Sequence, residues 1–187
     1  MLEKGVFQIK EVKVGRLFKG SDCLNPNSNS SYLTASQYAA CLGTGKDFGE
    51  RLKRIVDSYG RLDHRLVFIT DGAVWIREWI ADHYPLSCPV LDFYHAMEHL
   101  YQLADRAFAR DTAGKKQWCG RQKELLLDSQ VETVLKNIRL TSAGEEDKKK
   151  LMHYYENNKK RMSYKQYRNT GCGIIGSGAI ESAHRTV

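Results

Sequence analysis

Hydrophobic and polar residues alternate near the start of the chain, in GVFQIKEVKVGRLF over Gly5–Phe18. Alternation with a period of two is typical of half-buried strands, so this stretch predicts one long strand or two short ones. The polar cluster SDCLNPNSNSS then predicts a turn and loop, and YLTA after it predicts a short strand. Apolar residues next recur at helical spacing, which predicts a helix over Ser36–Tyr59, broken at Gly43–Gly45.

Two short apolar runs further along predict a pair of parallel strands. RLVFITDGA leads into Asp71, and VLD ends at Asp92. Between them, AVWIREWIADHY carries its large apolar residues on one helical face and predicts a crossover helix. Strands joined in this way pair in parallel, so both aspartates fall at carboxyl ends. Catalytic groups gather there in open α/β sheets, although Asp-Gly is also ordinary turn chemistry.

After Asp92 the hydrophobic periodicity is helical, with apolar stripes over Leu100–Phe108, Val131–Ile138 and Leu151–Tyr155. The sequence therefore predicts an α/β protein with an all-helical insertion. Three segments follow from this pattern: a core over residues 1–94, a basic helical insertion over 95–168 and a returning core helix over 169–187.

The positive charge is concentrated in the predicted insertion. The net charge is +7, and residues 114–168 hold 14 Lys and Arg against seven Asp and Glu. A contiguous basic block favours a polyanion such as DNA as partner, and a solvated helical face is an equally good explanation. Candidate DNA contacts are the runs Lys148, Lys149, Lys150 and Lys159, Lys160, Arg161.

Cysteine usage and hydropathy predict a cytoplasmic location. The five cysteines are odd in number and form no CxxC, which indicates reduced thiols and no disulfide framework. The start MLEKGVFQIK is unlike a signal peptide. No apolar run approaches the roughly 18 residues of a membrane span, so no membrane partner is expected.

The stretch TGCGIIGSGAIES contains a GxGxxG pattern in Gly171, Gly173 and Gly176. In dinucleotide-binding units such glycines follow a buried strand and precede an acidic residue about 20 positions on. Here polar, basic RMSYKQYRN precedes them and eleven residues follow Gly176, so no nucleotide cofactor is expected. Glu181 fits the third position of a helix capped by Gly178, and could equally swing towards a sheet edge.

The word DFYHAMEHL places His95, Glu98 and His99 on one helical face after Asp92. Such residue types could ligate a transition metal. Their spacing matches neither HExxH nor a Cys-His site, so capping and hydrogen-bonded packing are the favoured roles.

Five sequence motifs follow one another along the chain: KEVKVGRLF, FITDGAVWIREWI, VLDFYHAMEHL, RMSYKQYRNTG and GSGAIESAHR. In these motifs the chain resembles bacterial insertion-sequence transposases of the ISKra type, which are relatives of the Mutator-like DDE transposases. The resemblance covers nearly the whole chain. It implies a ribonuclease-H-like core, a mixed sheet with flanking helices, interrupted by an all-helical insertion, and it implies DNA strand cleavage and strand transfer in transposition.

The resemblance also implies roles for single residues. Asp71 and Glu181 match catalytic, metal-binding positions, and Asp92 and His95 match a supporting D-x-x-H word. Two-metal phosphodiester chemistry needs hard oxygen ligands, so the implied cofactor is Mg²⁺ or Mn²⁺, two ions about 4 Å apart. The glycines would form a hinge that delivers Glu181 to the sheet edge. The implied partners are DNA and a homo-oligomer on transposon ends, in the bacterial nucleoid.

One departure from the family pattern concerns the first catalytic aspartate, which the family places on a strand before KEVKVGRLF. Ten residues precede Glu11 without an aspartate, and the first aspartate is Asp22 in the predicted loop. The sequence therefore predicts an internal fragment that does not cut DNA alone. Two alternatives stay open: a non-enzymatic nucleic-acid-binding or oligomerisation remnant, and a small metal-dependent hydrolase using Asp92, His95 and His99.

Overall fold

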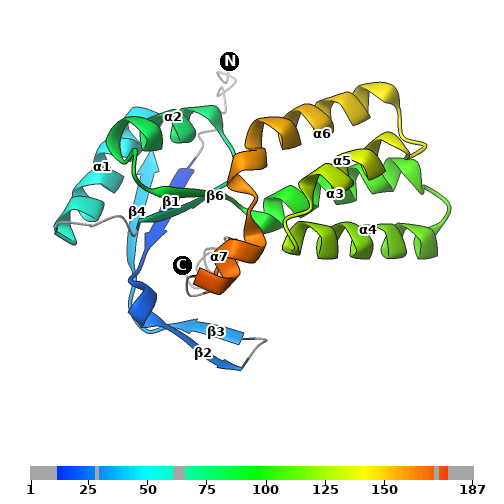
Figure 1. Cartoon of the computed structure of the whole chain (residues 1–187). Helices are drawn as coiled ribbons and strands as arrows, with labels where there is room; N and C mark the ends of the chain where they lie inside the picture. Colours follow the sequence, from blue (N-terminus) through cyan, green and yellow to red (C-terminus); the bar gives the residue numbers. More distant parts are fainter. Residues whose placement is uncertain (1–11, 28–29, 61–65, 171–172, 177–187) are drawn as a thin grey trace, which may run out of the picture. The chain divides into compact units, whose positions relative to one another are not determined.

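The computed structural model describes residues 12–27, 30–60, 66–170 and 173–176 (Figure 1). It is a mixed α/β protein that divides into two compact units, Met1–Asp63 and His64–Val187. Among the helices of the described ranges, none has both the length and the apolar character needed to cross a membrane.

The first unit is built on an antiparallel strand pair with one helix packed on it. Strand β1 (Val12–Leu17) pairs with β4 (Gln37–Leu42), and helix α1 (Gly45–Ser58) contacts both strands. The helix begins after Thr44, whose hydroxyl accepts a hydrogen bond from the Asp47 backbone N–H in a capping box. Among the residues of this unit whose burial is described, the buried side chains are Ala39, Cys41, Phe48, Leu52 and Val56.

Two sequence predictions for this unit are wrong. The predicted loop contains a 3-10 turn, η1 (Gly20–Asp22), and an antiparallel hairpin of β2 (Cys23–Asn27) and β3 (Ser30–Leu33). The first part of the helix predicted over Ser36–Tyr59 is strand β4. Its sequence QYAACL suits a helix locally, but all six residues pair with β1, and this tertiary pairing overrides the local preference.

The second unit contains the predicted parallel pair. Strands β5 (Val67–Thr70) and β6 (Cys88–Leu91) pair in parallel, with Thr70 opposite Leu91. Helix α2 (Val74–His83) is the crossover between them. The β5–α2–β6 prediction is therefore confirmed.

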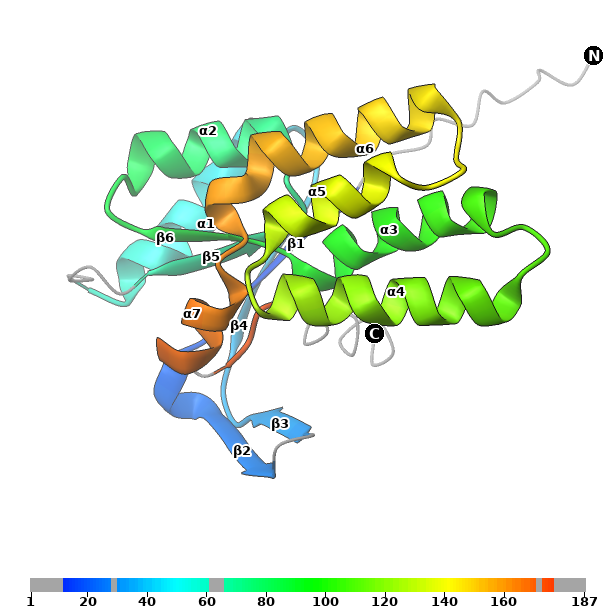
Figure 2. The ribbon, with the colours of Figure 1, turned by 45° about the vertical axis from the view of Figure 1, so that its right-hand side comes forward.

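Four helices follow β6 and run alternately away from the strands and back (Figures 1 and 2). Each contacts the next, and the first also contacts the last, which closes an antiparallel bundle. The helices are α3 (Phe93–Ala107), α4 (Thr112–Leu127), α5 (Val131–Arg139) and α6 (Glu145–Asn158). The turn η2 (Lys159–Arg161), which contacts β6, and helix α7 (Tyr164–Thr170) complete the described helices.

The core of this second unit joins the bundle to strand β6. Val90 and Leu91 of β6 belong to the same buried cluster as residues of α3 to α6. The same cluster also includes Tyr164 and Ile175. The helical character predicted after Asp92 is confirmed for the described residues. The predicted boundary between residues 94 and 95 falls in the first turn of α3, and the three-segment organisation stays a prediction.

Candidate functional site

Asp71 and Asp92 directly follow the last paired residues of β5 and β6. Thr70 and Leu91 are register partners, and the Asp92 backbone N–H donates to the Thr70 carbonyl oxygen at 2.8 Å. The parallel pairing therefore brings both aspartates to the same edge of the strand pair, as their positions in the sequence predicted.

Asp71 is exposed and stands in a tight turn. Its Oδ1 accepts a hydrogen bond from the Ala73 backbone N–H at 3.0 Å, and Gly72 has a φ of +93°. A Cβ on Gly72 would lie 2.9 Å from Leu91 Cδ1, so the turn needs glycine for both conformation and space. Turn chemistry thus fixes the Asp71 backbone, while the exposed carboxylate keeps access to solvent and to a cation.

Asp92 is buried, with 3% of its surface exposed, and it caps α3. Its Oδ1 accepts hydrogen bonds from the backbone N–H groups of Tyr94 at 2.8 Å and His95 at 3.1 Å. A carboxylate in this place satisfies helix N–H groups and interacts favourably with the helix dipole. Asp92 therefore fixes the start of α3, as the capping interpretation expected.

The rings of His95 and His99 lie edge to face beside Tyr154 of α6. The ring centroids of His95 and His99 are 4.7 Å apart, and those of His99 and Tyr154 are 4.4 Å apart. Burial, with a smaller effect from His95, lowers the pKa of His99. His95 Nδ1 lies 3.4 Å from Glu98 Oε2. In the described part of the chain, no group of three or more His, Cys, Asp or Glu side chains could hold a metal, so the hydrolase hypothesis lacks a preformed centre.

Tyr154 and Arg161 tie the helical bundle to the carboxyl ends of the two strands. The Tyr154 hydroxyl donates to the Asp71 carbonyl oxygen at 3.1 Å, and burial raises the Tyr154 pKa. The Arg161 guanidinium donates to Thr70 Oγ1 and, at 3.5 Å, to the Val90 carbonyl oxygen. Sequence reasoning missed both tethers because their partners are 83 and 91 positions away.

The position of Arg161 corrects its prediction as a DNA contact. Its side chain is buried, with 5% of its surface exposed, and its Nη1 donates to Asn158 Oδ1 at 3.1 Å. Burial lowers its pKa. A guanidinium in this place cannot also reach a phosphate outside the fold, so Arg161 leaves the set of candidate DNA contacts.

The lysines predicted to contact DNA differ in whether they form ion pairs or hydrogen bonds within the protein. Lys148 pairs with Glu145 and donates to the Thr141 carbonyl oxygen at 3.3 Å. Lys150 pairs with Glu146, and Lys159 pairs with Glu132. Lys149 and Lys160 are exposed and form no ion pair with the residues the structure describes. These two remain the clearest surface cations of the predicted set.

Glu181 lies outside the described residues, but the glycine-rich segment before it is partly described. The Ile175 carbonyl oxygen accepts a hydrogen bond from the Phe93 backbone N–H at 3.0 Å, and Ile175 is buried. A Cβ on Gly176 would overlap the Tyr94 ring and lie 3.2 Å from Asp92 Oδ1. This segment therefore passes the edge where β6 ends, five positions before Glu181.

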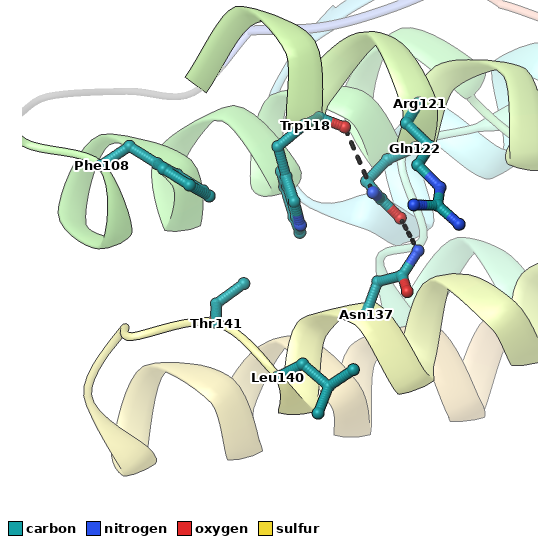
Figure 3. A pocket seen from close by; sticks show the side chains of 7 residues that line it. All are labelled: Phe108, Trp118, Arg121, Gln122, Asn137, Leu140 and Thr141. Atoms are coloured by element: carbon teal, nitrogen blue, oxygen red, sulfur yellow. Dashed lines mark hydrogen bonds between the residues drawn. The ribbon is translucent and has the colours of Figure 1, made fainter. Parts of the chain in front are cut away.

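A second candidate site lies between α4 and α5 (Figure 3). The pocket has a volume of about 210 Å³ and is lined by Phe108, Trp118, Arg121, Gln122, Asn137, Leu140 and Thr141. We call it the α4–α5 pocket. Sequence reasoning missed it, although a tryptophan inside a basic helical segment was an available signal.

Comparisons with protein-family models, with curated proteins and with solved structures each gave no match.

Proposed function

We propose that this chain is part of the catalytic domain of a DNA transposase of the ISKra type. The observation that carries the proposal is the placement of Asp71 and Asp92 at the carboxyl ends of two paired parallel strands. The β5–α2–β6 order followed by a helical bundle is compatible with a ribonuclease-H-like core and a helical insertion. The glycine-rich segment, which hydrogen-bonds to the backbone beside Asp92, supports the return of Glu181 to this edge.

The donor set fits a hard divalent cation such as Mg²⁺ or Mn²⁺. Asp71 offers an exposed carboxylate on a backbone that Tyr154 and the Ala73 turn hold in place. Glu181 would be the second ligand. Asp92 has one oxygen committed to the α3 cap, so it supports the site by fixing that helix and its neighbouring backbone. When bound, such ions supply the Lewis acidity that phosphodiester cleavage needs.

Exposed cations of the bundle would hold the DNA backbone. Lys149 and Lys160 are free of ion pairs to described residues, and phosphate contacts of this kind are independent of base sequence. Assembly of several copies on transposon ends and a location in the bacterial nucleoid belong to the same proposal.

Strand cleavage with Mg²⁺ or Mn²⁺ tests the proposal. The 187-residue chain is compared with a version extended by the residues encoded upstream, on DNA that carries the element's ends. The resemblance implies a further aspartate upstream, so we expect cleavage by the extended chain, its loss with Asp71→Asn and none by the shorter chain. Cleavage that survives Asp71→Asn would overturn the assignment.

The second candidate function is a non-enzymatic nucleic-acid-binding remnant. It is favoured by the lack of a three-ligand metal group among the described residues, together with the basic bundle. Salt-dependent DNA binding without cleavage by either chain is the outcome that would select it.

A further inference from the structure

We propose that the α4–α5 pocket binds an unpaired base of single-stranded nucleic acid. The inference rests on the nucleic-acid-binding part of the proposed function and is independent of the metal chemistry. Three properties of the pocket carry it: its aromatic and aliphatic walls, its polar edge and the cations beside it.

The walls of the pocket suit a flat ring. The Phe108 and Trp118 rings lie on one side, with centroids 6.0 Å apart, and Leu140 and Thr141 lie across from them (Figure 3). Leu140 is 85% exposed, whereas Val134, Leu135 and Ile138 of the same segment are buried. The volume of about 210 Å³ is below the roughly 300 Å³ at which sites for drug-sized ligands begin, so it suits a single ring system.

The polar edge of the pocket favours a base over an apolar side chain. Asn137 Nδ2 donates to Gln122 Oε1 at 2.9 Å, and Gln122 Nε2 donates to the Trp118 carbonyl oxygen at 3.2 Å. The bond to Gln122 fixes the orientation of the Asn137 amide, with its nitrogen towards Gln122 and its oxygen on the opposite side, and Arg121 lies at the same end of the pocket (Figure 3). A base edge offers matching donors and acceptors, and an apolar ligand would leave these groups unpaired.

Exposed cations lie close in sequence to residues that line the pocket. Arg110 follows Phe108 closely, and Lys136 and Arg139 are near Asn137 in the sequence of α5. All three are exposed and form no ion pair with the described residues, in contrast to Arg106 and Lys115, which pair with Asp147 and Asp105. Aromatic rings for bases combined with cations for phosphates are the arrangement by which proteins bind single strands.

Fluorescence anisotropy with a labelled oligothymidine and with a duplex of the same length tests the inference. Stacking on an aromatic ring is worth about 1–3 kcal/mol per base, so we expect Trp118→Ala to lower single-strand affinity by about tenfold. Leu140→Glu replaces the apolar opposite wall by a carboxylate, which should lower the affinity as well. Leu86→Glu is the matched control, because Leu86 is also exposed, at 69%, but lies outside the pocket. The duplex affinity of Trp118→Ala should equal that of the wild-type chain.

Three outcomes would overturn the inference. If Trp118→Ala and Leu140→Glu bind the oligothymidine as wild type does, the pocket takes no base, and duplex binding with metal-dependent cleavage would still support the proposed function. If Leu86→Glu weakens binding as much as Leu140→Glu, only the added negative charge matters. Binding of neither nucleic acid by the wild-type chain would contradict both the inference and the proposed DNA partner.

Discussion

The Tyr154 hydroxyl donates a hydrogen bond of 3.1 Å to the carbonyl oxygen of Asp71, which joins helix α6 to the turn after β5 across 83 positions of sequence. The candidate catalytic aspartate is therefore held from the helical bundle as well as by its own strand. Arg161 makes the corresponding contact one residue earlier, at Thr70.

Tyr154→Phe should lower the free energy of unfolding by about 1 kcal/mol, the usual net value of one hydrogen bond, because only the hydroxyl is removed. Tyr155→Phe is the matched control: its hydroxyl donates to the Ala96 carbonyl oxygen at 2.8 Å in a fully buried place. We expect Tyr155→Phe to cost at least as much. Urea denaturation measures both, and an unchanged midpoint for Tyr154→Phe would argue against the tether.

Arg161→Met should destabilise the protein by about 3 kcal/mol, since it leaves buried hydrogen-bonding partners of a charged group unpaired. The neighbouring variant Lys160→Met removes an exposed charge from the same turn and should stay within about 0.5 kcal/mol of wild type. Thermal unfolding compares the two. Equal stability of Arg161→Met and wild type would restore Arg161 as a surface cation.

Gly176→Ala should destabilise the protein by about 1–3 kcal/mol, because the new methyl group overlaps the Tyr94 ring and approaches Asp92. Gly120→Ala in α4 meets nothing within 4 Å, and we expect it to stabilise the helix by about 0.5–1 kcal/mol. Opposite signs in chemical denaturation would support the close packing of the glycine-rich segment. A neutral Gly176→Ala would show that this segment does not pack at the end of β6.

Local sequence signals were enough for β5, α2 and β6, because each is specified by its own residues: an apolar β-branched run, a helical stripe and a turn after Asp71. They failed for Gln37–Leu42, where good helix formers become a strand through pairing with β1. Local signals also failed to predict the burial of Arg161, because in the sequence it is simply the last cation of a basic run. Its burial depends on Thr70 and Val90, which the chain brings to it only on folding.

Lysines that are close in sequence are now predicted to have different effects on DNA binding. Lys149→Glu and Lys160→Glu should weaken duplex binding. They should also make the plot of log binding constant against log salt concentration less steep, by about 0.9 for each phosphate that the protein no longer neutralises. Lys148→Met should mainly lower stability, since Lys148 bonds the carbonyl oxygen of Thr141 within the fold. Affinity measured at several salt concentrations checks this, and an unaltered salt slope for Lys149→Glu and Lys160→Glu would indicate a merely solvated surface.

The central claim is that Asp71 and Glu181 together bind a divalent metal ion, and Mn²⁺ binding tests it most directly. Electron paramagnetic resonance of free Mn²⁺ gives the affinity of the wild-type chain, of Asp71→Asn, of Glu181→Gln and of the control Glu124→Gln, an exposed carboxylate of α4. We expect Asp71→Asn and Glu181→Gln each to weaken Mn²⁺ binding by about tenfold or more. Even the loss of a residue that only hydrogen-bonds to a metal ligand lowers metal affinity by about tenfold or more. Glu124→Gln should bind as wild type does. Wild-type affinity in both Asp71→Asn and Glu181→Gln, or no Mn²⁺ binding by the wild-type chain, would contradict the account.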